Sequence, residues 1–376
     1  MKVLIVANGM PTKENPLLGI FEFDQAKALA ARGVEVWFFA IDLRSIRRRR
    51  KIGISYGESF GVKWYIIALP VGAVPLRFLC AIGKYAFRYL YKKVFKLYKP
   101  DLIHAHFTEI GYMCVDLATK YDIRLYMTEH SSAINSPIIS SQLLNCAKYT
   151  YSNVDCLIAV SSGLQKSIER LTGRQSLVVH NIIDTNLFSK NQNVDHKGFR
   201  IVTVAGLIPR KRINLLLEAV SLLRFDISDL RLDIIGDGSH RKLYEQYVNE
   251  NNLQDIVTFW GRLDRNQILN VFQQSDCFAL VSAVETFGVV YVEAMASGLP
   301  VIATRCGGPE DFVNENNGIL IDVDDRKALI NAIKYMAQNI NKYDRAMIKA
   351  ETQRFSPEYI SQKLEELYSM NSIERI

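Results

Sequence analysis

Long apolar runs are missing from this sequence of 376 residues. No stretch reaches the roughly 20 consecutive apolar residues that a membrane-spanning helix needs. Met1 leads directly into the strand-like segment Val3–Ala7, without the basic and apolar segments of a signal peptide. We therefore expect a cytoplasmic protein that is not inserted in a membrane.

Metal-binding and redox spacings are missing as well. The six cysteines are scattered and include no C-x-x-C pair, and the six histidines form no H-E-x-x-H pattern. We expect the cysteines to be buried free thiols, and the sequence indicates no metal site. No G-x-G-x-x-G follows a strand-like segment, which argues against a nicotinamide-dependent oxidoreductase.

Acidic residues are scarce in the first half of the chain. Residues 1–190 contain 25 Lys and Arg against 14 Asp and Glu, a net charge of +11, whereas the remainder contains 21 against 25, a net charge of −4. The whole chain carries +7, with 49% hydrophobic and 23% charged residues. This length and composition fit a globular protein of two domains, the first of which is basic.

Short apolar runs alternate with amphipathic, helix-length segments along the whole chain, which predicts an α/β protein with parallel sheets. We predict an N-terminal domain at 1–190, a C-terminal domain at 191–355, and a C-terminal helix at 356–376 that packs on the N-terminal domain. The polar stretch 189–197 is the predicted linker. The predicted strands are residues 3–7, 34–40, 102–104, 125–128, 156–160 and 177–179 of the first domain, and 200–205, 231–235, 257–259, 277–281, 301–303 and 318–321 of the second.

The stretch from Leu280 to Ala303 is the most informative part of the sequence. A strand that ends near Val281 leads into a short loop with Glu285, and a helix begins at about Gly288. The N–H groups of Phe287, Gly288 and Val289 at the start of this helix are suited to hold a diphosphate, because they have no partner inside the helix. Glu293 lies further along the same helix.

This E-x7-E arrangement resembles the donor site of the retaining family-4 glycosyltransferases, which have the GT-B fold. The resemblance implies two Rossmann-like, doubly wound parallel-sheet domains that face a cleft. Further landmarks of that family follow in order along nearly the whole chain. They are Pro100–His106, Thr128-Glu-His130, Ala159-Val-Ser161, Asn181–Asp184, Ala205–Lys211, Gly236-Asp237-Gly238, Phe259–Leu263 and Arg305–Glu310.

The resemblance also implies roles for single residues on the donor side. Glu293 would bind the ribose hydroxyls and Glu285 the transferred sugar, because a carboxylate accepts hydrogen bonds from vicinal hydroxyls. Lys211 would contact the diphosphate, with Arg210 adding positive charge. Many relatives carry an arginine where this chain has Gly206, so Arg210 is a candidate to replace it.

Other positions follow from the same resemblance. The loops at Gly236 and at Arg262 and Leu263 would surround the donor nucleotide, whose base is read by backbone contacts. Gly19, in the loop after the first strand, would let the backbone approach the donor. His130 would lie beside the donor sugar and the attacking hydroxyl. His106, which we expect at the exit of its strand, would face the acceptor.

The implied reaction retains the anomeric configuration. No matched carboxylate is an obvious nucleophile, so we expect a front-face substitution in which the diphosphate oxygen takes the acceptor proton. We expect no metal cofactor, with a nucleotide-diphosphate sugar as co-substrate. The alternatives are a GT-B-like nucleotide-sugar epimerase, a phosphorylase of related fold, and a catalytically silent nucleotide-sugar-binding subunit.

Basic residues of the first half point to the acceptor. Residues 44–51 hold six cations. A helix predicted at 75–99 places five of its cations mainly on one side: Arg77, Lys84, Arg88, Lys92 and Lys96. One interpretation is an ordinary solvated face; the other is contact with the anionic inner face of a membrane, where a lipid-linked saccharide acceptor for cell-surface polysaccharide synthesis would lie. No nucleic-acid module is recognisable. The sugar, the base, the linkage and the oligomeric state stay open.

Overall fold

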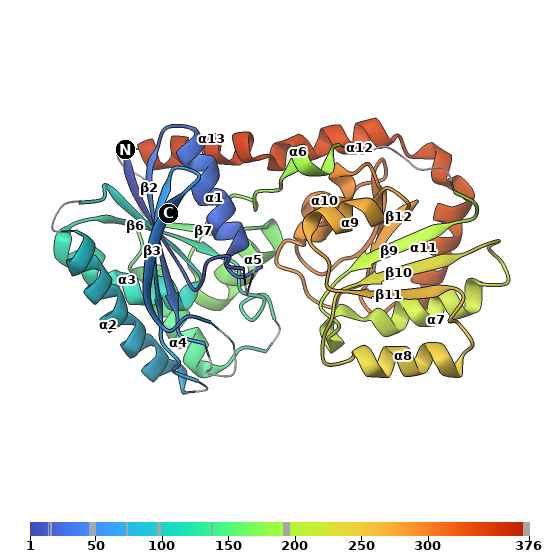
Figure 1. Cartoon of the computed structure of the whole chain (residues 1–376), viewed down its shortest axis with the longest axis horizontal. Helices are drawn as coiled ribbons and strands as arrows, with labels where there is room; N and C mark the ends of the chain where they lie inside the picture. Colours follow the sequence, from blue (N-terminus) through green and yellow to red (C-terminus); the bar gives the residue numbers. More distant parts are fainter. Residues whose placement is uncertain are drawn as a thin grey trace. The chain divides into compact units, whose positions relative to one another are not determined.

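The computed structural model describes residues 1–13, 15, 17–44, 50–72, 74–95, 99–136, 138–190 and 196–370. The chain forms two compact units, the first made of Met1–Ile182 with Pro357–Ile376 and the second of Ile183–Ser356 (Figure 1). The first unit thus ends eight residues before the boundary predicted at residue 190. Residues 191–195 of the predicted linker and residues 45–49 and 96 of the basic segments lie outside the described residues.

The first unit is built on an eight-stranded sheet in the order β3-β4-β2-β1-β5-β6-β7-β8. Strand β3 is antiparallel to β4, and the other neighbouring strands are parallel. The chain order reverses direction between β1 and β5, which makes the sheet doubly wound. The strands are β1 Lys2–Ala7, β2 Glu35–Asp42, β3 Gly53–Ser59, β4 Val62–Ala68, β5 Leu102–His106, β6 Arg124–Glu129, β7 Cys156–Ala159 and β8 Leu177–Val178.

The C-terminal helix α13 (Pro357–Ser369) completes the core of this first unit. Its residues Ile360, Leu364, Leu367 and Tyr368 are buried in the same cluster as β1 and β2. Because all these side chains leave water together, α13 stabilises the unit although it is remote in sequence. The other helices are α1 Ile20–Ala31, α2 Leu76–Val94, α3 Thr108–Tyr121, α4 Ser141–Ser152 and α5 Ser162–Thr172.

The second unit is built on a six-stranded parallel sheet in the order β11-β10-β9-β12-β13-β14. This is the doubly wound order in which the first strand, β9, lies beside the fourth, β12. The switch point between β9 and β12 is where such sheets bind ligands, outside the carboxyl ends of the strands. The strands are β9 Arg200–Val204, β10 Arg231–Ile235, β11 Val257–Gly261, β12 Cys277–Leu280, β13 Val301–Thr304 and β14 Gly318–Ile321.

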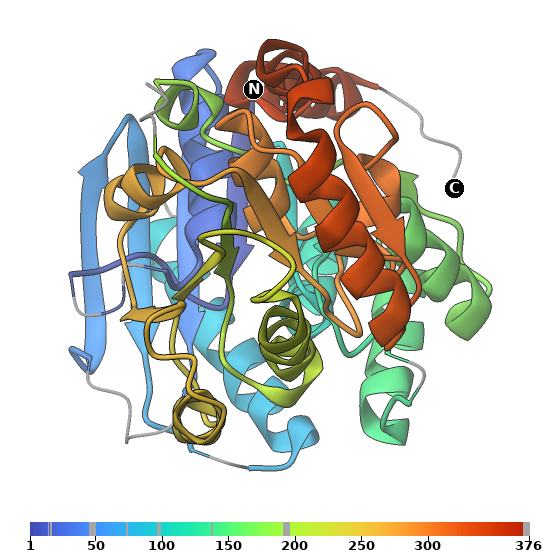
Figure 2. The same cartoon turned by 90° about the vertical axis from the view of Figure 1, so that its right-hand side faces the viewer.

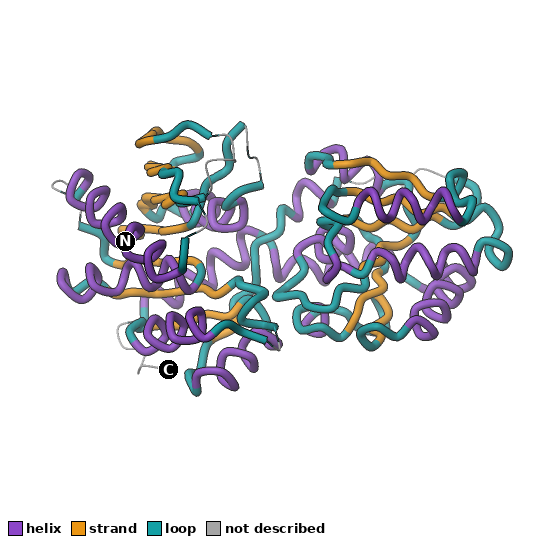
Figure 3. Tube along the Cα trace, turned by 90° about the horizontal axis from the view of Figure 1, so that it is seen from below, coloured by secondary structure: helices purple, strands orange, loops and turns teal. Residues whose placement is uncertain are grey.

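Helices lie on both sides of the strands in each unit, as Figure 3 shows. In the second unit, α7 packs against both α8 and α11 and lies between them in Figure 2. The described helices of this unit are α6 Thr185–Phe188, α7 Ile213–Leu223, α8 Arg241–Glu250, α9 Arg265–Phe272, α10 Val289–Ala296, α11 Arg326–Asn339 and α12 Arg345–Glu351, with short 3₁₀ turns η1 Pro209–Lys211, η2 Pro309–Asp311, η3 Ile340–Lys342 and η4 Thr352–Phe355.

The predicted fold class of two doubly wound α/β units is therefore confirmed. Two local predictions need correction. The hairpin of β3 and β4 was not predicted, and β5 continues past the predicted end at residue 104. His106 is the last residue of the strand, at its exit as predicted, but it is fully buried. Among the described residues, no helix is long and apolar enough to cross a membrane.

Candidate active site

Lys211 and Glu285 meet at the switch point of the second sheet. Lys211 ends the 3₁₀ turn η1, which follows β9, and Glu285 lies in the loop that follows β12. The Lys211 ammonium donates to Oε1 of Glu285, and the Ser282 hydroxyl donates to the same oxygen at 2.8 Å. Glu285 is only 8% exposed. The structure thus joins two of the predicted site residues into one shielded ion pair.

Backbone hydrogen bonds fix the loop around Glu285. Its N–H donates to the carbonyl of Cys306 at 3.2 Å, and its carbonyl accepts from the N–H of Gly308 at the same distance. The N–H of Ala283 donates to the carbonyl of Arg210 at 2.8 Å. The loops after β9, β12 and β13 are therefore tied together, which holds the Lys211–Glu285 pair in place.

The next helix begins where the sequence predicts. Gly288 is the N-cap of α10, with φ of 92°, and a Cβ added there would lie 2.7 Å from the ring of Tyr291. Glycine is therefore needed both for the left-handed backbone and for the close ring. Phe287 is fully buried, and Val289 opens the helix. No side chain caps this end, and the start of a helix is where backbone N–H groups are suited to hold an anion.

Glu293 is held by a cation that the sequence motifs did not indicate. Its side chain is 7% exposed in the body of α10, and Oε1 lies 3.6 Å from Nε of Arg265. Arg265 opens α9, directly after the N-cap Asp264. Because a buried carboxylate needs compensation, a basic residue near Glu293 could have been anticipated, but its position in the sequence could not.

The remaining predicted donor residues lie in loops at the same edge of the sheet. Gly206 follows β9 and is exposed, and a Cβ built on it would meet no atom within 4 Å. Arg210 is exposed beside Lys211. Gly236 follows β10, with φ of 129° and the carbonyl oxygen of Ala205 only 1.9 Å from an added Cβ, so no larger residue fits there.

Arg262 and Leu263 follow β11 at this same edge. Arg262 is exposed, and Leu263 is partly buried. Since β9, β10, β11 and β12 are parallel neighbours, all the predicted donor residues of this unit come from carboxyl ends of strands or from the helix that follows one. The structure brings them to one edge of one sheet.

Two nearby acidic residues form ion pairs with arginines. Asp322 and Asp324 have an Asp-x-Asp spacing, which the prediction of a donor half without this motif overlooked. Asp324 accepts from Nε and Nη2 of Arg212 at 2.6 and 3.0 Å, which holds the pKa of this carboxyl below its usual value, and Asp322 lies 3.6 Å from Arg305. In the part of the chain that the structure describes, no three His, Cys, Asp or Glu side chains are grouped to hold a metal ion.

Three histidines adjoin one another in the first unit. His106 Nδ1 and His130 Nε2 are 2.9 Å apart, with their rings stacked. The ring of His106 also stacks on that of His104. His104 Nε2 contacts the Thr128 hydroxyl at 2.7 Å. The predicted residues His106 and His130 are therefore direct neighbours, at the ends of β5 and β6.

Burial keeps these imidazoles neutral. It lowers the pKa of His104 and of His130 to about 3, and it lowers that of His106 well below the ordinary value. A side-chain hydrogen bond between His130 and Asn181 opposes the effect at His130 but does not outweigh it. Neutral rings at physiological pH can orient a ligand by hydrogen bonds, but they do not carry a charge to it.

A buried carboxylate shapes the loop that carries His130. Glu129 Oε1 accepts from the N–H groups of His130 and Ser131 at 2.9 and 2.8 Å, and Oε2 accepts from the Tyr151 hydroxyl at 2.7 Å and from Thr108. These four bonds satisfy a charge that would otherwise be costly to bury.

Gly19, the remaining predicted residue, is the left-handed N-cap of α1 in this unit.

Comparisons with known proteins agree with this architecture. Sucrose-phosphate synthase from Thermosynechococcus elongatus superposes with a TM-score of 0.79, at 22% identity and 98% coverage of both chains. Anabaena Alr3699/HepE, solved in complex with UDP, superposes with a TM-score of 0.75, at 20% identity, over 98% of this chain and all of that one. Both sheets and these neighbours define the class as a GT-B fold.

Family models and relatives match at the level of sequence. The model for glycosyl transferases group 1 matches residues 184–354, and the model for glycosyltransferase family 4 matches residues 22–187. The chain belongs to the family-4 glycosyltransferases, as the sequence resemblance predicted. It is similar to a phosphatidylinositol N-acetylglucosaminyltransferase subunit of Homo sapiens (26% identity over 302 residues, 77% of this chain) and to TuaC of Bacillus subtilis, named for teichuronic acid biosynthesis (26% over 354 residues, 89% of this chain).

The chain does not span the full length of its relatives. It covers 62% of the human protein, and 62% of the N-acetyl-alpha-D-glucosaminyl L-malate synthase of Bacillus anthracis, to which it is 26% identical over 239 residues. It covers 88% of TuaC.

Proposed function

We propose that the chain is a retaining glycosyltransferase that moves a sugar from a nucleotide-diphosphate donor to a saccharide acceptor. The observation behind this proposal is the Lys211–Glu285 ion pair at the switch point between β9 and β12. A cation and the start of α10 lie at one edge of the sheet, where a diphosphate would find both positive charge and the N–H groups of a helix start. A structural neighbour solved in complex with UDP supports a nucleotide donor.

In this proposal Lys211 and Arg210 stabilise the departing diphosphate, whose negative charge grows as the glycosidic bond breaks. Glu293 binds the ribose hydroxyls. Glu285 already accepts bonds from Lys211 and Ser282, which suits a carboxylate that holds a sugar hydroxyl better than one that attacks the anomeric carbon. Front-face substitution, with the acceptor proton passing to the diphosphate, is therefore the preferred route to retention.

A donor screen tests the proposal. The unfolding temperature should rise with one of UDP, GDP or ADP, because a ligand at 100 times its Kd adds about 2.7 kcal/mol of stability. The matching nucleotide sugars should then be hydrolysed slowly and transferred to an acceptor. Binding without turnover would favour a silent subunit, and conversion of the donor to its epimer would favour an epimerase.

We also propose that catalysis needs no metal. Lys211, Arg210 and the start of α10 supply positive charge at the proposed diphosphate site, whereas Asp322 and Asp324 are paired with arginines. Transfer should therefore be unchanged in excess EDTA. Loss of transfer that Mg²⁺ or Mn²⁺ restores would refute this part of the proposal.

We further propose a lipid-linked acceptor at the inner face of a membrane. Helix α2 exposes an apolar row of Phe78, Ile82, Tyr85 and Tyr89, spaced by three and four residues along one side. Arg77 and Lys92 are exposed on the same helix. Aromatic side chains flanked by cations suit the interface of an anionic bilayer.

Not every cation of the basic segments is available for this contact. Lys84 and Arg88 each lie 3.1 Å from Asp116, and Arg44 and Arg50 bind the buried Asp42 at 2.6 and 3.3 Å. Arg50 also donates to the Leu69 carbonyl at 2.8 Å. These four residues therefore hold the unit together and are poor choices for a test of lipid binding.

Vesicle co-sedimentation distinguishes a membrane-binding face from an ordinary solvated face. Binding to vesicles with phosphatidylglycerol should fall as salt rises, because head-group attraction is screened beyond about 8 Å at physiological ionic strength. The double variant Arg77→Ser, Lys92→Ser should bind less, whereas Lys242→Ser, Lys327→Ser, an equal charge change at exposed positions of the second unit, should not. Wild-type protein that ignores anionic vesicles at low salt would make a soluble acceptor the better proposal.

A further inference from the structure

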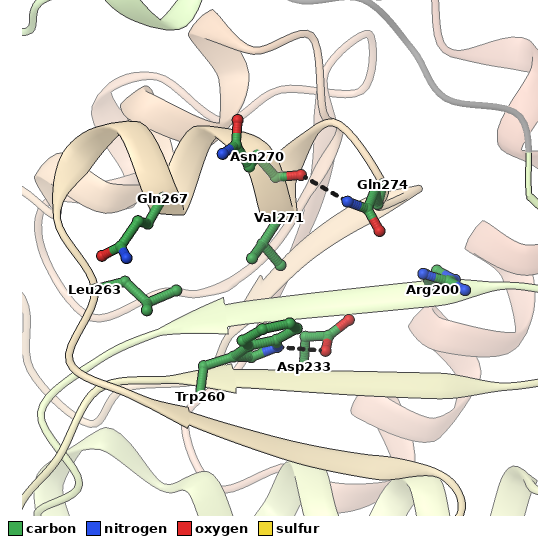
Figure 4. Close-up of a pocket in the computed structure, with 8 residues that line it drawn as sticks. All are labelled: Arg200, Asp233, Trp260, Leu263, Gln267, Asn270, Val271 and Gln274. Carbon is green, nitrogen blue, oxygen red and sulfur yellow. Dashed lines mark hydrogen bonds between the residues drawn. The ribbon is translucent and has the colours of Figure 1, made fainter.

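A groove in the second unit has neither Lys211 nor Glu285 in its lining, although it shares Leu263 with the predicted donor loop. It has a volume of about 220 Å³ and is bounded by α9 on one side and by β9, β10 and β11 on the other (Figure 4). A water molecule takes up about 30 Å³ of liquid, and pockets for drug-sized ligands begin at roughly 300 Å³. The groove therefore suits one small ring rather than a nucleotide.

Trp260 forms one wall of the groove and is 48% exposed. Its indole N–H donates to Oδ1 of Asp233 at 2.7 Å, from the neighbouring strand β10 (Figure 4). This bond fixes the ring on the sheet, so its orientation is set before any ligand arrives. Tryptophan is highly buried on average, so a ring that is held in place and left half in water offers its exposed surface to a ligand.

The opposite wall carries carboxamides. Gln267, Asn270 and Gln274 follow one another at spacings of three and four residues, so they share one side of α9 and its C-terminal extension (Figure 4). Gln267 uses its side-chain oxygen in the capping box with Asp264, which leaves its NH₂ group as a donor. Leu263 and Val271 add apolar surface between the two walls.

Charges in the groove compensate each other. Arg200 supplies one cation and Asp233 one carboxylate. Nε of Arg200 is buried without a hydrogen-bond partner in the described part of the chain. Burial raises the pKa of Asp233, while the Trp260 indole and the Arg200 charge act in the opposite direction. A groove with no net charge and many hydrogen-bonding groups gives an anion no advantage.

We propose that this groove is an accessory saccharide site, which binds one neutral pyranose ring against Trp260. The apolar C–H face of a sugar ring can be buried against the indole, and its hydroxyls can both donate to and accept from the carboxamides of α9. Neither partner requires charge. Such a site would hold a saccharide unit away from the reacting bond, and its existence does not depend on the proposed reaction.

Fluorine NMR of protein labelled with 5-fluorotryptophan tests the proposal. The chain has three tryptophans, of which Trp260 alone lies in the second unit, and the variant Trp260→Phe assigns its signal. Methyl glycosides of glucose, galactose, mannose and N-acetylglucosamine are titrated at millimolar concentrations, with UDP saturating. The Trp260 signal should shift saturably with at least one sugar while those of Trp37 and Trp64 stay in place.

A matched pair of variants on α9 completes the test. Asn270→Leu replaces a hydrogen-bonding side chain at the rim of the groove with an apolar one and should weaken sugar binding at least about tenfold. Asn266→Leu makes the same change at an exposed position of α9 that does not line the groove, and should leave the affinity within about twofold. Three results would overturn the proposal: no sugar moves the signal, Asn270→Leu binds like wild type, or UDP or uridine itself occupies the groove and displaces the sugars.

Discussion

Removing the Lys211 ammonium should destabilise the second unit unless Glu285 is neutralised as well. In Lys211→Met the Glu285 carboxylate keeps the Ser282 hydroxyl but loses its cation. Breaking a fully buried pair in this way costs about 3–5 kcal/mol. The two side chains here are 14% and 11% exposed, so we expect the low end of that range, about 3 kcal/mol.

The double variant Lys211→Met, Glu285→Gln should recover most of this loss, because no charge is then left unpaired. Glu285→Gln alone should cost about 1–2 kcal/mol, since the amide oxygen still accepts from Lys211. If the double variant loses only about 1 kcal/mol, the coupling energy is roughly 3–4 kcal/mol, at or slightly above the upper end for residues in contact. For a unit of this size, a loss of about 3 kcal/mol lowers Tm by roughly 6–12 °C.

Urea unfolding followed by the Trp260 fluorine signal measures the second unit specifically, because the other two tryptophans lie in the first. Arg210→Met is the matched control, since Arg210 is the exposed neighbour of Lys211 and its backbone bond to Ala283 does not need the side chain. It should change stability by less than about 0.5 kcal/mol. The assigned coupling is refuted if Lys211→Met is equally mild, or if the losses of the two single variants simply add in the double variant.

Glu293→Gln should weaken nucleotide binding about tenfold in a titration, whereas Glu285→Gln should mainly lower kcat in steady-state kinetics. An equal loss of affinity in both variants with unchanged turnover would contradict the assigned roles. Gly206→Arg should fold normally, because a side chain there meets open space. It should tighten diphosphate binding several-fold, as measured by calorimetry. A weaker affinity would show that Arg210 already supplies the cation for the diphosphate. His104 has a folded-state pKa of about 3, below its unfolded value of about 6.5, so it contributes stability that is present above pH 6.5 and is lost as pH falls. His104→Gln should therefore reduce the drop in unfolding free energy between pH 7 and pH 5 by roughly 2 kcal/mol. An unchanged drop would show that His104 does not titrate this way.

The strands of both sheets could be predicted because each is a short apolar run between polar turns. The hairpin of β3 and β4 could not. Strand β3 (Gly53–Ser59) is at the edge of the sheet and is buried nowhere along its length, so its sequence lacks the apolar alternation of a packed strand. What holds it is pairing with β4 and the contact of Gly57 with Trp64, where an added Cβ would lie 2.5 Å from the indole.

The sequence predicted which residues belong to the candidate site, but it did not predict which of them are in contact. Patterns of sequence place Lys211 and Glu285 after separate strands, and only the order β9 beside β12 makes those strands neighbours. Strand order depends on how the whole sheet packs, which no local pattern encodes. The same limit explains Ser282 and Arg265, which are identifiable as partners of Glu285 and Glu293 only once the fold is known.

The histidines at the ends of β5 and β6 bear on the proposed mechanism. His106 Nε2 is buried without a partner among the described residues. An orphaned N–H is rarer in proteins than an unused acceptor, so the proton of His106 belongs on Nδ1, from which it is donated to Nε2 of His130 2.9 Å away. The His130 proton is then on Nδ1. A ring that already accepts a hydrogen bond and whose pKa is about 3 is a poor general base at neutral pH. Such a histidine cannot readily take the acceptor proton, which agrees with a substitution in which the departing diphosphate takes that proton.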